Sequence, residues 1–450
     1  MFTYVKLKNF LSFGDTEFNF KQTAATAKKL VAIYGENGSG KSNFVKSFDF
    51  LYHTVKSFSQ EKQAERISEV LGELESKESE SIDILHEILR YTSPEQYLTS
   101  CRTVNCDEPT ELEFGFIFDG HEGFYKIAFS QKIVSESLYG FTGKQRNYLF
   151  RISSDESEKI TCKFWSGLFP NKKFADEIRD EIQKYWGKHS FLGIITRQIG
   201  EKNDRYIGEN ISKHLLDILF LFLPNITVIN KSNTFSPSVI GEKPESILDD
   251  MESGTIEQTK LPVLERTEHI LKLFFTQTYA DIKDVVYETE KISDNKLRYR
   301  LYVDKMIAGK IRRISFQNES AGTQQVLKVV RMLLGLFSGA TVIYDEIDNG
   351  IHDILLCNII RSLQGEINGQ LIITTHNTML LEEIDPKSAY VISVDYMGNK
   401  EVSCMADFAI QSNNNVRIKY LKGLFGGTPY VDGIDYDAMI SELEATKEES

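Results

Sequence analysis

Apolar positions divide the chain into strand-like and helix-like stretches. Three short apolar runs, at 30–34, 340–344 and 370–375, have the length and β-prone composition of buried strands in a parallel sheet. The first run leads through a glycine-rich turn into a stretch with apolar residues at helical spacing. Between 111 and 152 apolar and polar residues alternate, and Asp119-Gly120 is typical of a hairpin turn. The pattern therefore predicts an α/β core with an added antiparallel β subdomain.

Composition and charge narrow the class of protein. The 450 residues are 41% hydrophobic and 26% charged, which is typical of globular domains. The net charge of −13 argues against a protein whose main role is to coat nucleic acid. The five cysteines show no Cys-x-x-Cys spacing, so we expect neither a disulfide framework nor a zinc site. The longest apolar run, 218–223, is far shorter than the ~20 residues that span a bilayer, and we expect a cytoplasmic protein without membrane contact.

The segment 35–42 matches the phosphate-binding pattern G-x-x-x-x-G-K-[ST]. It lies between a predicted strand and a predicted helix, an order that favours a phosphate loop over an ordinary glycine-rich turn. Its backbone N–H groups would surround phosphate oxygens of ATP, Lys41 would reach the β and γ phosphates, and Ser42 would ligate Mg²⁺. The predicted nucleotide-binding residues are Gly35, Asn37, Gly38, Ser39, Gly40, Lys41, Ser42 and Asn43.

Two further predicted strands end in polar residues suited to the same chemistry. Asp345 and Glu346 follow the run 340–344, and His376 follows the run 370–375. Taken alone, such acids are most often part of a solvated turn, and a lone histidine is more often structural. Beside a phosphate loop, we expect Asp345 to bind Mg²⁺, Glu346 to polarise the attacking water and His376 to hydrogen-bond the γ phosphate. Lys41, Glu346 and His376 are the predicted catalytic residues.

A second anion-binding turn is predicted at Ser320-Ala321-Gly322, directly before a largely apolar helix that ends near 337. The alternative is an ordinary helix N-cap at Ser320. Gln198 is a candidate magnesium-sensing residue that links two lobes, and a surface glutamine is an equal alternative. Lys296, Arg298 and Arg300 alternate with apolar residues, so their cationic face suits either a nucleic-acid backbone or an acidic protein, or is simply solvated.

These motifs together resemble the Walker A, signature, Walker B and switch motifs of ABC-type ATPase heads of the RecF/SMC-like branch. More narrowly, the chain resembles the abortive-infection (anti-phage) ATP-binding proteins, which include the ATPase subunits of the PARIS and Rlo systems. The stretches that carry this resemblance are 8–13, 136–139, 191–193, 319–324, 345–348 with His352, 374–377 and 417–423. The resemblance implies an α/β ABC-type head with an antiparallel β subdomain, helical insertions and no long coiled coil.

The resemblance also implies a function. In such heads the signature helix caps a nucleotide bound to a second copy, so we expect a homodimer or higher homo-oligomer, with His352 at the contact. The expected role is an ATPase sensor and scaffold that controls a separately encoded effector, a Toprim-type nuclease, in response to a phage-encoded trigger. Departures from the LSGGQ signature, such as Glu319 and Thr323, leave the rate of hydrolysis open, and we expect slow hydrolysis. The alternative is a RecF-like repair ATPase that clamps duplex DNA; a transporter subunit is disfavoured by the large insertions.

Six segments are expected along the chain. They are the first part of the ATPase core with Walker A (1–48), a helical insertion (49–110), the antiparallel β subdomain (111–165), a helical lobe with a flexible loop (166–280), the second part of the core with signature, Walker B and switch histidine (281–405), and a C-terminal extension (406–450).

Overall fold

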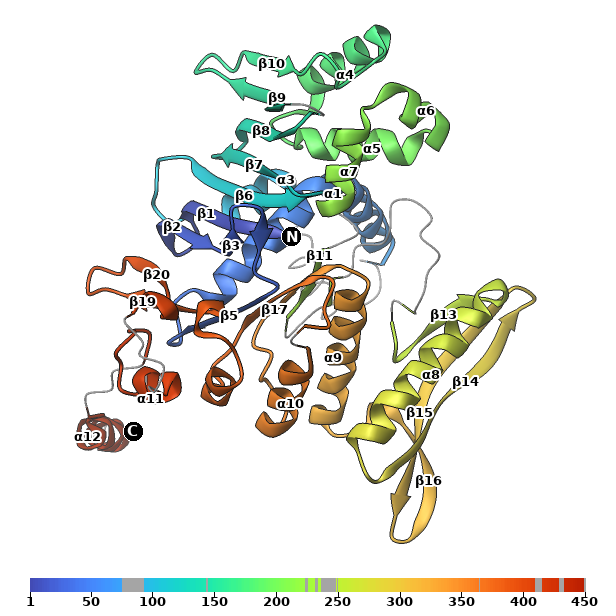
Figure 1. Cartoon of the computed structure of the whole chain (residues 1–450), viewed down its shortest axis with the longest axis vertical. Helices are drawn as coiled ribbons and strands as arrows, with labels where there is room; N and C mark the ends of the chain where they lie inside the picture. The colour runs from blue at the N-terminus through green and yellow to red at the C-terminus, as the bar shows by residue number, and fades with distance from the viewer. Residues whose placement is uncertain are drawn as a thin grey trace.

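Two seven-stranded sheets form the body of the chain in the computed structural model (Figure 1). The structure describes residues 1–74, 93–142, 145–222, 226–230, 234–235, 248, 250–363, 365–408, 415–428 and 433–448. A third, smaller sheet extends from the body beside one helix. Parts of the predicted flexible loop at 231–262 and of the predicted helical insertion at 49–110 lie outside these residues.

The first sheet is antiparallel and has the order β10-β9-β8-β7-β6-β1-β2. Its strands are β1 (Phe2–Phe10), β2 (Phe13–Asn19), β6 (Thr110–Phe118), β7 (His121–Phe129), β8 (Ile133–Phe141), β9 (Arg146–Ser154) and β10 (Ile160–Phe164). The predicted hairpin is confirmed, because Phe118 pairs with His121 across Asp119 and Gly120, whose φ values are 49° and 74°. The predicted β subdomain 111–165 thus corresponds to β6–β10, but it also takes in β1 and β2.

The second sheet has the order β12-β11-β17-β18-β5-β19-β20 and is parallel except at its two edge strands. Its strands are β5 (Leu30–Gly35), β11 (Ile226–Ile229), β12 (Thr234–Phe235), β17 (Thr341–Tyr344), β18 (Gln370–Thr374), β19 (Ala389–Val394) and β20 (Lys400–Cys404). The three predicted parallel strands are confirmed as β5, β17 and β18, which are neighbours. The segment expected as a helical lobe with a flexible loop, 166–280, also contains strand β11, because a four-residue apolar run carries too little periodicity to be recognised.

Helix α1 (Lys41–Leu74) packs between the two sheets. Its Phe48 ring lies 5.1 Å from the ring of Phe2 and 5.8 Å from that of Phe114, both in the first sheet. On β5, Val31 and Ile33 face this core, whereas Ala32 and Tyr34 face a second core on the opposite side of the parallel sheet. That second core contains α9 (Ala321–Phe337) and α10 (Asp353–Leu363). Alternation along β5 therefore produces a sheet that is covered on both faces.

One buried side chain joins the two sheets. The amide of Gln370, the first residue of β18, accepts a hydrogen bond from Phe2 N at 2.7 Å and donates to Phe2 O at 2.8 Å and to Lys28 O at 2.9 Å. Gln370 is completely buried. The start of the first sheet is therefore fixed to the start of a central strand of the second.

The third sheet forms a projecting arm with α8 (Leu261–Thr278), visible at the lower right of Figure 1. Its antiparallel strands are β13 (Ser253–Glu257), β14 (Ile282–Ser293), β15 (Lys296–Ile307) and β16 (Lys310–Ser315). Leu271 and Phe275 of α8 belong to the same core as Val285 and Leu301 of the sheet. The arm leads directly into α9, the predicted signature helix.

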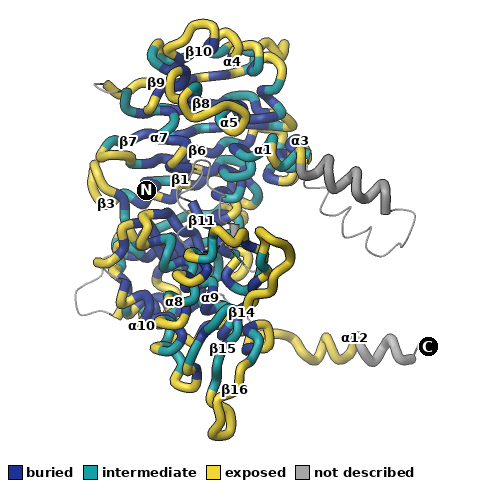
Figure 2. Tube along the Cα trace, turned by 90° about the vertical axis from the view of Figure 1, so that its right-hand side faces the viewer, coloured by how far each residue is buried: buried dark blue, intermediate teal, exposed yellow. Residues whose placement is uncertain are grey.

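The remaining elements cover the sheets or extend from them. They are β3 (Lys21–Thr23), β4 (Thr26–Ala27), α3 (Pro94–Ser100), α4 (Lys172–Tyr185), α5 (Phe191–Glu201), α6 (Asp204–Asn210), α7 (Lys213–Phe222), α11 (Val416–Leu421), α12 (Tyr436–Glu448) and the 3₁₀ turns Gln258–Lys260, Phe316–Asn318, Thr378–Glu382, Pro386–Ser388 and Met405–Asp407. Figure 2 shows α12 extending away from the body, and its side chains from 436 to 442 are exposed. Among the described residues, no helix is both long and apolar enough to traverse a lipid bilayer.

Candidate nucleotide-binding site

The phosphate loop connects β5 to α1, as predicted from its sequence. Gly38 and Gly40 have φ values of 83° and 109°, which side chains larger than hydrogen rarely permit. The loop carries Lys41 at the first turn of α1, and its ammonium donates to Gly35 O at 2.8 Å and to Glu36 O at 2.9 Å. The hydroxyl oxygen of Ser39, within the loop, is buried and has no hydrogen-bond partner in the described part of the chain, and Ser42 is exposed beside Lys41.

The two predicted acids follow β17 and are held by a threonine from the neighbouring strand. Thr374, at the end of β18, donates its hydroxyl to Asp345 Oδ1 at 2.6 Å, and the same hydroxyl accepts from Glu346 N at 2.8 Å. The φ of Glu346 is 51°, a left-handed conformation that costs about 1–2 kcal/mol for a residue with a side chain. Strain of this kind persists where the surrounding structure imposes a function on the backbone. Thr374 was missed by the sequence-based prediction because a strand threonine carries no specific signal.

His376 lies at the end of β18, on the same edge of the sheet. Its backbone N–H donates to the carboxylate of Asp348 at 3.3 Å, and Thr375 donates to that carboxylate at 2.8 Å. The pKa of His376 is lowered from its usual 6.5, first by partial loss of solvent and then by the positive charge of Lys41, against the opposite effect of Asp348, Glu346 and Asp345. These influences place the histidine within electrostatic reach of the other predicted residues.

The charges that act on Lys41 come from the same acids that act on His376. Burial lowers the pKa of Lys41, while Glu346, Asp345 and Asp348 raise it. A buried ammonium beside two loop carbonyls and three nearby acids is already positioned for a ligand with its own negative charge. The structure therefore brings Lys41, Asp345, Glu346 and His376 to the carboxyl edge of one parallel sheet, where such folds bind ligands.

The predicted signature residues lie at the start of α9. Ser320 is the N-cap, and its hydroxyl accepts from Thr323 N at 3.2 Å, so the N-cap alternative is correct as a local description. Gly322 packs tightly against the loop after β17, because a Cβ there would approach Gly350 O to 2.8 Å. Within the described part of the chain, no hydrogen bond or ion pair joins residues 320–322 to the loop 35–42.

Gln198 is not brought to this site, so its prediction as a magnesium ligand is corrected. It lies on α5. Near the start of this helix Gly193 packs against Thr54 and Ser57 of α1, and at its end the Glu201 carboxylate lies 3.9 Å from the Lys62 ammonium. Thr54 is thirteen residues beyond Lys41, about 20 Å along the helix. The direction of α5 takes Gln198 still farther from the phosphate loop.

The donor set fits a magnesium–triphosphate. Successive N–H groups, a lysine ammonium and a helix N-terminus suit phosphate oxygens, and the Ser42 hydroxyl with the Asp345 carboxylate provides the oxygen ligands that Mg²⁺ prefers. Together the phosphate loop, the strand order and the carboxylates at the end of β17 define an α/β P-loop fold with a candidate nucleotide-binding site at the carboxyl edge of its parallel sheet.

Comparisons with known proteins give a family match over part of the chain and low-scoring structural overlaps. A sequence model of the AAA domain matches residues 4–223, just under half of the chain. No curated protein matches the sequence. Structural overlaps include the SMC head domain from Thermotoga maritima (13% identity, TM-score 0.35, covering 90% of this chain and 98% of that one).

Two further SMC structures overlap to a similar extent. One is an SMC head bound to the C-terminal winged-helix domain of ScpA (13% identity, TM-score 0.42, covering 89% and 96%). The other is an SMC head with an extended coiled coil, bound to the C-terminal domain of ScpA derived from Pyrococcus furiosus (14% identity, TM-score 0.41, covering 94% and 99%). At these scores the overlaps add nothing to the strand order and loop geometry described above.

Proposed function

We propose that the chain binds ATP with Mg²⁺ and hydrolyses it slowly. The observation that carries the proposal is the convergence of Lys41, Asp345, Glu346 and His376 on one sheet edge, although Asp345 follows Lys41 by most of the chain. A bound Mg²⁺ would neutralise phosphate charge and hold the phosphates in place. Within the chain, Ser42 and Asp345 hold the ion, and Lys41 stabilises the charge of the terminal phosphates.

Glu346 and His376 have the roles closest to the reaction. The carboxylate of Glu346 accepts a proton from the attacking water and orients it toward the γ phosphate. The imidazole of His376, with its lowered pKa, is neutral near pH 7 and donates a hydrogen bond to a γ-phosphate oxygen. Thr374 fixes the position of both acids through its two hydrogen bonds.

Two substitutions test binding and hydrolysis separately. Lys41→Ala should abolish ATP binding in calorimetry, because it removes the cation inside the loop. Glu346→Gln should leave the ATP affinity within about threefold and lower phosphate release by at least about 10²-fold. Glu366→Gln, an exposed glutamate after α10, is the matched control and should match the wild type. Full phosphate release by Glu346→Gln would contradict the assignment of the base.

We also infer a head-to-head homodimer, and a higher homo-oligomer would be built from such pairs. Residues 320–322 lack polar contact with the chain's own phosphate loop, which supports their capping a nucleotide held by a second copy. Because Glu346→Gln retains ATP, light scattering should show more dimer for this variant with ATP than with ADP. A mass that does not depend on the nucleotide would contradict the proposal.

The defence role is the broader part of the proposal and is supported by the family resemblance of the motifs. The chain acts as the ATPase sensor of an abortive-infection system and holds a separately encoded Toprim-type nuclease, which a phage-encoded trigger releases. Co-expression with the product of the neighbouring gene should give a stable complex, and Lys41→Ala should alter its retention. A neighbouring product that never co-purifies, with either the wild type or this variant, would contradict this role.

The DNA clamp is the second candidate, since Lys296, Arg298 and Arg300 lie exposed on β15. However, Glu290 and Glu288 of β14 stand directly opposite Arg298 and Arg300, and Arg298 lies 3.3 Å from Glu290. The face is therefore of mixed charge, and it suits a phosphate backbone less well than the sequence alone indicated.

A further inference from the structure

Lys400 places a second ammonium group against the phosphate loop. It is the first residue of β20, the edge strand of the second sheet, and its side chain is half-buried. Its Nζ donates to Ser12 Oγ and to Gly38 O, the latter at 3.3 Å, and lies 5.1 Å from the centre of the Phe13 ring. A Cβ at Gly40 would come within 2.9 Å of this Nζ. The lysine therefore touches the loop itself.

The charge of Lys400 has no acidic partner among the residues that the structure describes. Its contacts are a hydroxyl, a carbonyl and an aromatic ring, whereas Lys305, Lys126 and Lys188 each pair with a carboxylate. Partial burial lowers the pKa of Lys400. Lysines that lose solvent are normally paired with an anion. Among the described residues no carboxylate pairs with Lys400, and a phosphate bound in the loop would supply the missing negative charge.

The two lysines lie on different sides of the loop. Lys41 contacts the carbonyls of Gly35 and Glu36 and feels the charges of the acids after β17. Lys400 instead shares Ser12 Oγ with Asn43, whose side-chain amide donates to that oxygen at 2.7 Å. The Lys400 side is therefore the side away from the acids that act on the terminal phosphate.

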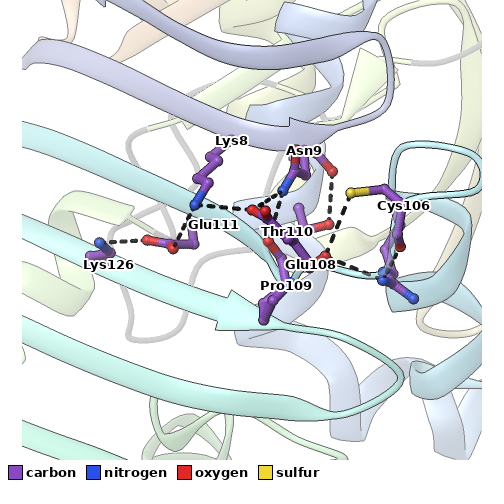
Figure 3. A network of polar contacts seen from close by, with 9 residues as sticks. Lys8, Asn9, Cys106, Glu108, Pro109, Thr110, Glu111 and Lys126 are labelled. Carbon is purple, nitrogen blue, oxygen red and sulfur yellow. Dashed lines mark hydrogen bonds and ion pairs between the residues drawn. The ribbon is translucent and has the colours of Figure 1, made fainter.

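The segment that leads to Ser12 is firmly held, as Figure 3 shows for Asn9 near the end of β1. Asn9 has a φ of 53°; its side chain donates to Pro109 O at 3.3 Å, and its carbonyl accepts from Thr110 Oγ1 at 2.8 Å. Leu11, with a φ of 52°, donates its N–H to Cys101 O at 3.0 Å. The first sheet thus presents Ser12 and Phe13 to Lys400 in a fixed position.

We propose that Lys400 is a second cationic ligand for the phosphate chain of the bound nucleotide, on its α and β phosphates. The inference rests on the proposed ATP binding and adds a residue from a different part of the chain. When a nucleotide binds, the ammonium exchanges its weak contacts with Gly38 O and Ser12 for charge-assisted hydrogen bonds to phosphate. Since ADP and ATP share these phosphates, both ligands engage Lys400 equally.

The test compares Lys400→Met with Lys163→Met, which removes an exposed lysine of β10. Calorimetric titration with ATP and with ADP, each with Mg²⁺, should show about tenfold weaker binding of both nucleotides to Lys400→Met. Lys163→Met should bind as the wild type does, and Lys400→Arg should recover most of the affinity. Thermal unfolding checks that Lys400→Met remains folded, as expected because the lysine carbonyl, not its side chain, bonds Thr16.

The possible outcomes separate this inference from the proposed function. Unchanged affinity of Lys400→Met for both nucleotides, with Lys41→Ala inactive in binding, overturns the role of Lys400 alone. Weaker binding of ATP but not of ADP would place the ammonium on the γ phosphate and overturn the assignment to α and β. A wild-type chain that binds neither nucleotide would overturn the proposed function itself, and this inference with it.

Discussion

Glu136 of the first sheet and Asp345 of the second are two carboxylates with different surroundings. Glu136 of β8 is 1% exposed and accepts hydrogen bonds from Tyr125 Oη at 2.9 Å, Trp186 Nε1 at 2.9 Å, Phe191 N at 2.6 Å and Leu192 N at 3.3 Å. Asp345, after β17, is half-buried and accepts one side-chain hydrogen bond, from Thr374, among the described residues.

The difference between them distinguishes a structural carboxylate from one suited to a ligand. The four donors to Glu136 come from β7, the segment after α4 and the start of α5, so the carboxylate joins these elements and has no capacity left. Burial still raises the pKa of Glu136, although its donors oppose that shift. Asp345 retains lone pairs at an open sheet edge beside a second acid, an arrangement that a divalent cation would stabilise.

The largest expected effect is on stability at Glu136. Glu136→Ala should lower the free energy of unfolding by about 3 kcal/mol, because four buried donors lose their acceptor. Urea unfolding followed by circular dichroism measures this change. Glu156→Ala, at an exposed loop position, should change it by less than about 0.5 kcal/mol. Equal stabilities for the two variants would show that Glu136 has no structural role.

The next effect concerns the threonine that orients the site acids. Thr374→Val should lower the rate of ATP hydrolysis by about 10–100-fold, a barrier increase of about 1.4–2.7 kcal/mol, since misplaced acids lose orientation. ATP affinity should remain within about twofold. Thr374→Ser retains the hydroxyl and should recover most of the activity, whereas Thr161→Val on β10 serves as the neutral control. A valine variant that hydrolyses ATP normally would be inconsistent with this role.

Asp49 of α1 is a case between Glu136 and Asp345, because one of its carboxylate oxygens is buried and has no hydrogen-bond partner among the residues that the structure describes. Burial, followed by the charge of Asp345, raises its pKa to about 6, with Lys46 opposing. The folded chain therefore favours the protonated acid, and its stability falls as the pH rises from the usual 3.8 of an aspartate to about 6. Asp49→Asn removes this cost and should stabilise the chain by about 2–3 kcal/mol at pH 8, with a difference that disappears as the pH falls toward 3.8.

Thermal unfolding of Asp49→Asn and wild type from pH 4 to pH 8 measures that difference. Asp180→Asn, an exposed aspartate of α4, controls for the loss of one surface charge. A stability difference that stays constant across this range would mean that Asp49 does not titrate as described.

The smallest effect is expected at the arm. Arg298→Glu with Arg300→Glu should leave ATP hydrolysis within about twofold, with or without duplex DNA, because each arginine faces a glutamate on β14. Phosphate-release assays with added DNA measure this, and Lys163→Glu is the control. DNA stimulation that the arginine substitutions abolish would instead favour the clamp.

The sequence was sufficient to predict which strands and loops carry the candidate site, but not the residues and elements that surround them. The loop 35–42, Asp345 and His376 each follow an apolar run that proved to be a strand, so a linear signal was sufficient. No role was predicted for Thr374, although it lies in the stretch 374–377, or for Lys400, because their contacts arise only from neighbours brought close by the sheet order. Gln198 was misplaced because a helical pattern does not reveal the direction in which α5 crosses α1.

The charges on the arm show a second limit of prediction from the sequence. Three alternating cations on β15 were visible in the sequence, but the glutamates that face them lie on β14 and are matched only through the strand register. Similarly, β11 could not be separated from the helices before it, yet Asp345 N donates to Ile229 O at 2.8 Å and so depends on that strand.

The hydrogen bonds between Gln370 and Phe2 have a consequence for how the protein folds during its synthesis. The amide binds Phe2, which is synthesised long before Gln370, and β5 has strands on both sides only after β18 and β19 have been made. The N-terminal strands must therefore wait, incompletely packed, for residues made hundreds of positions later. We expect truncated nascent chains that end before β18 to depend on chaperones, whereas chains that include β19 should become resistant to protease.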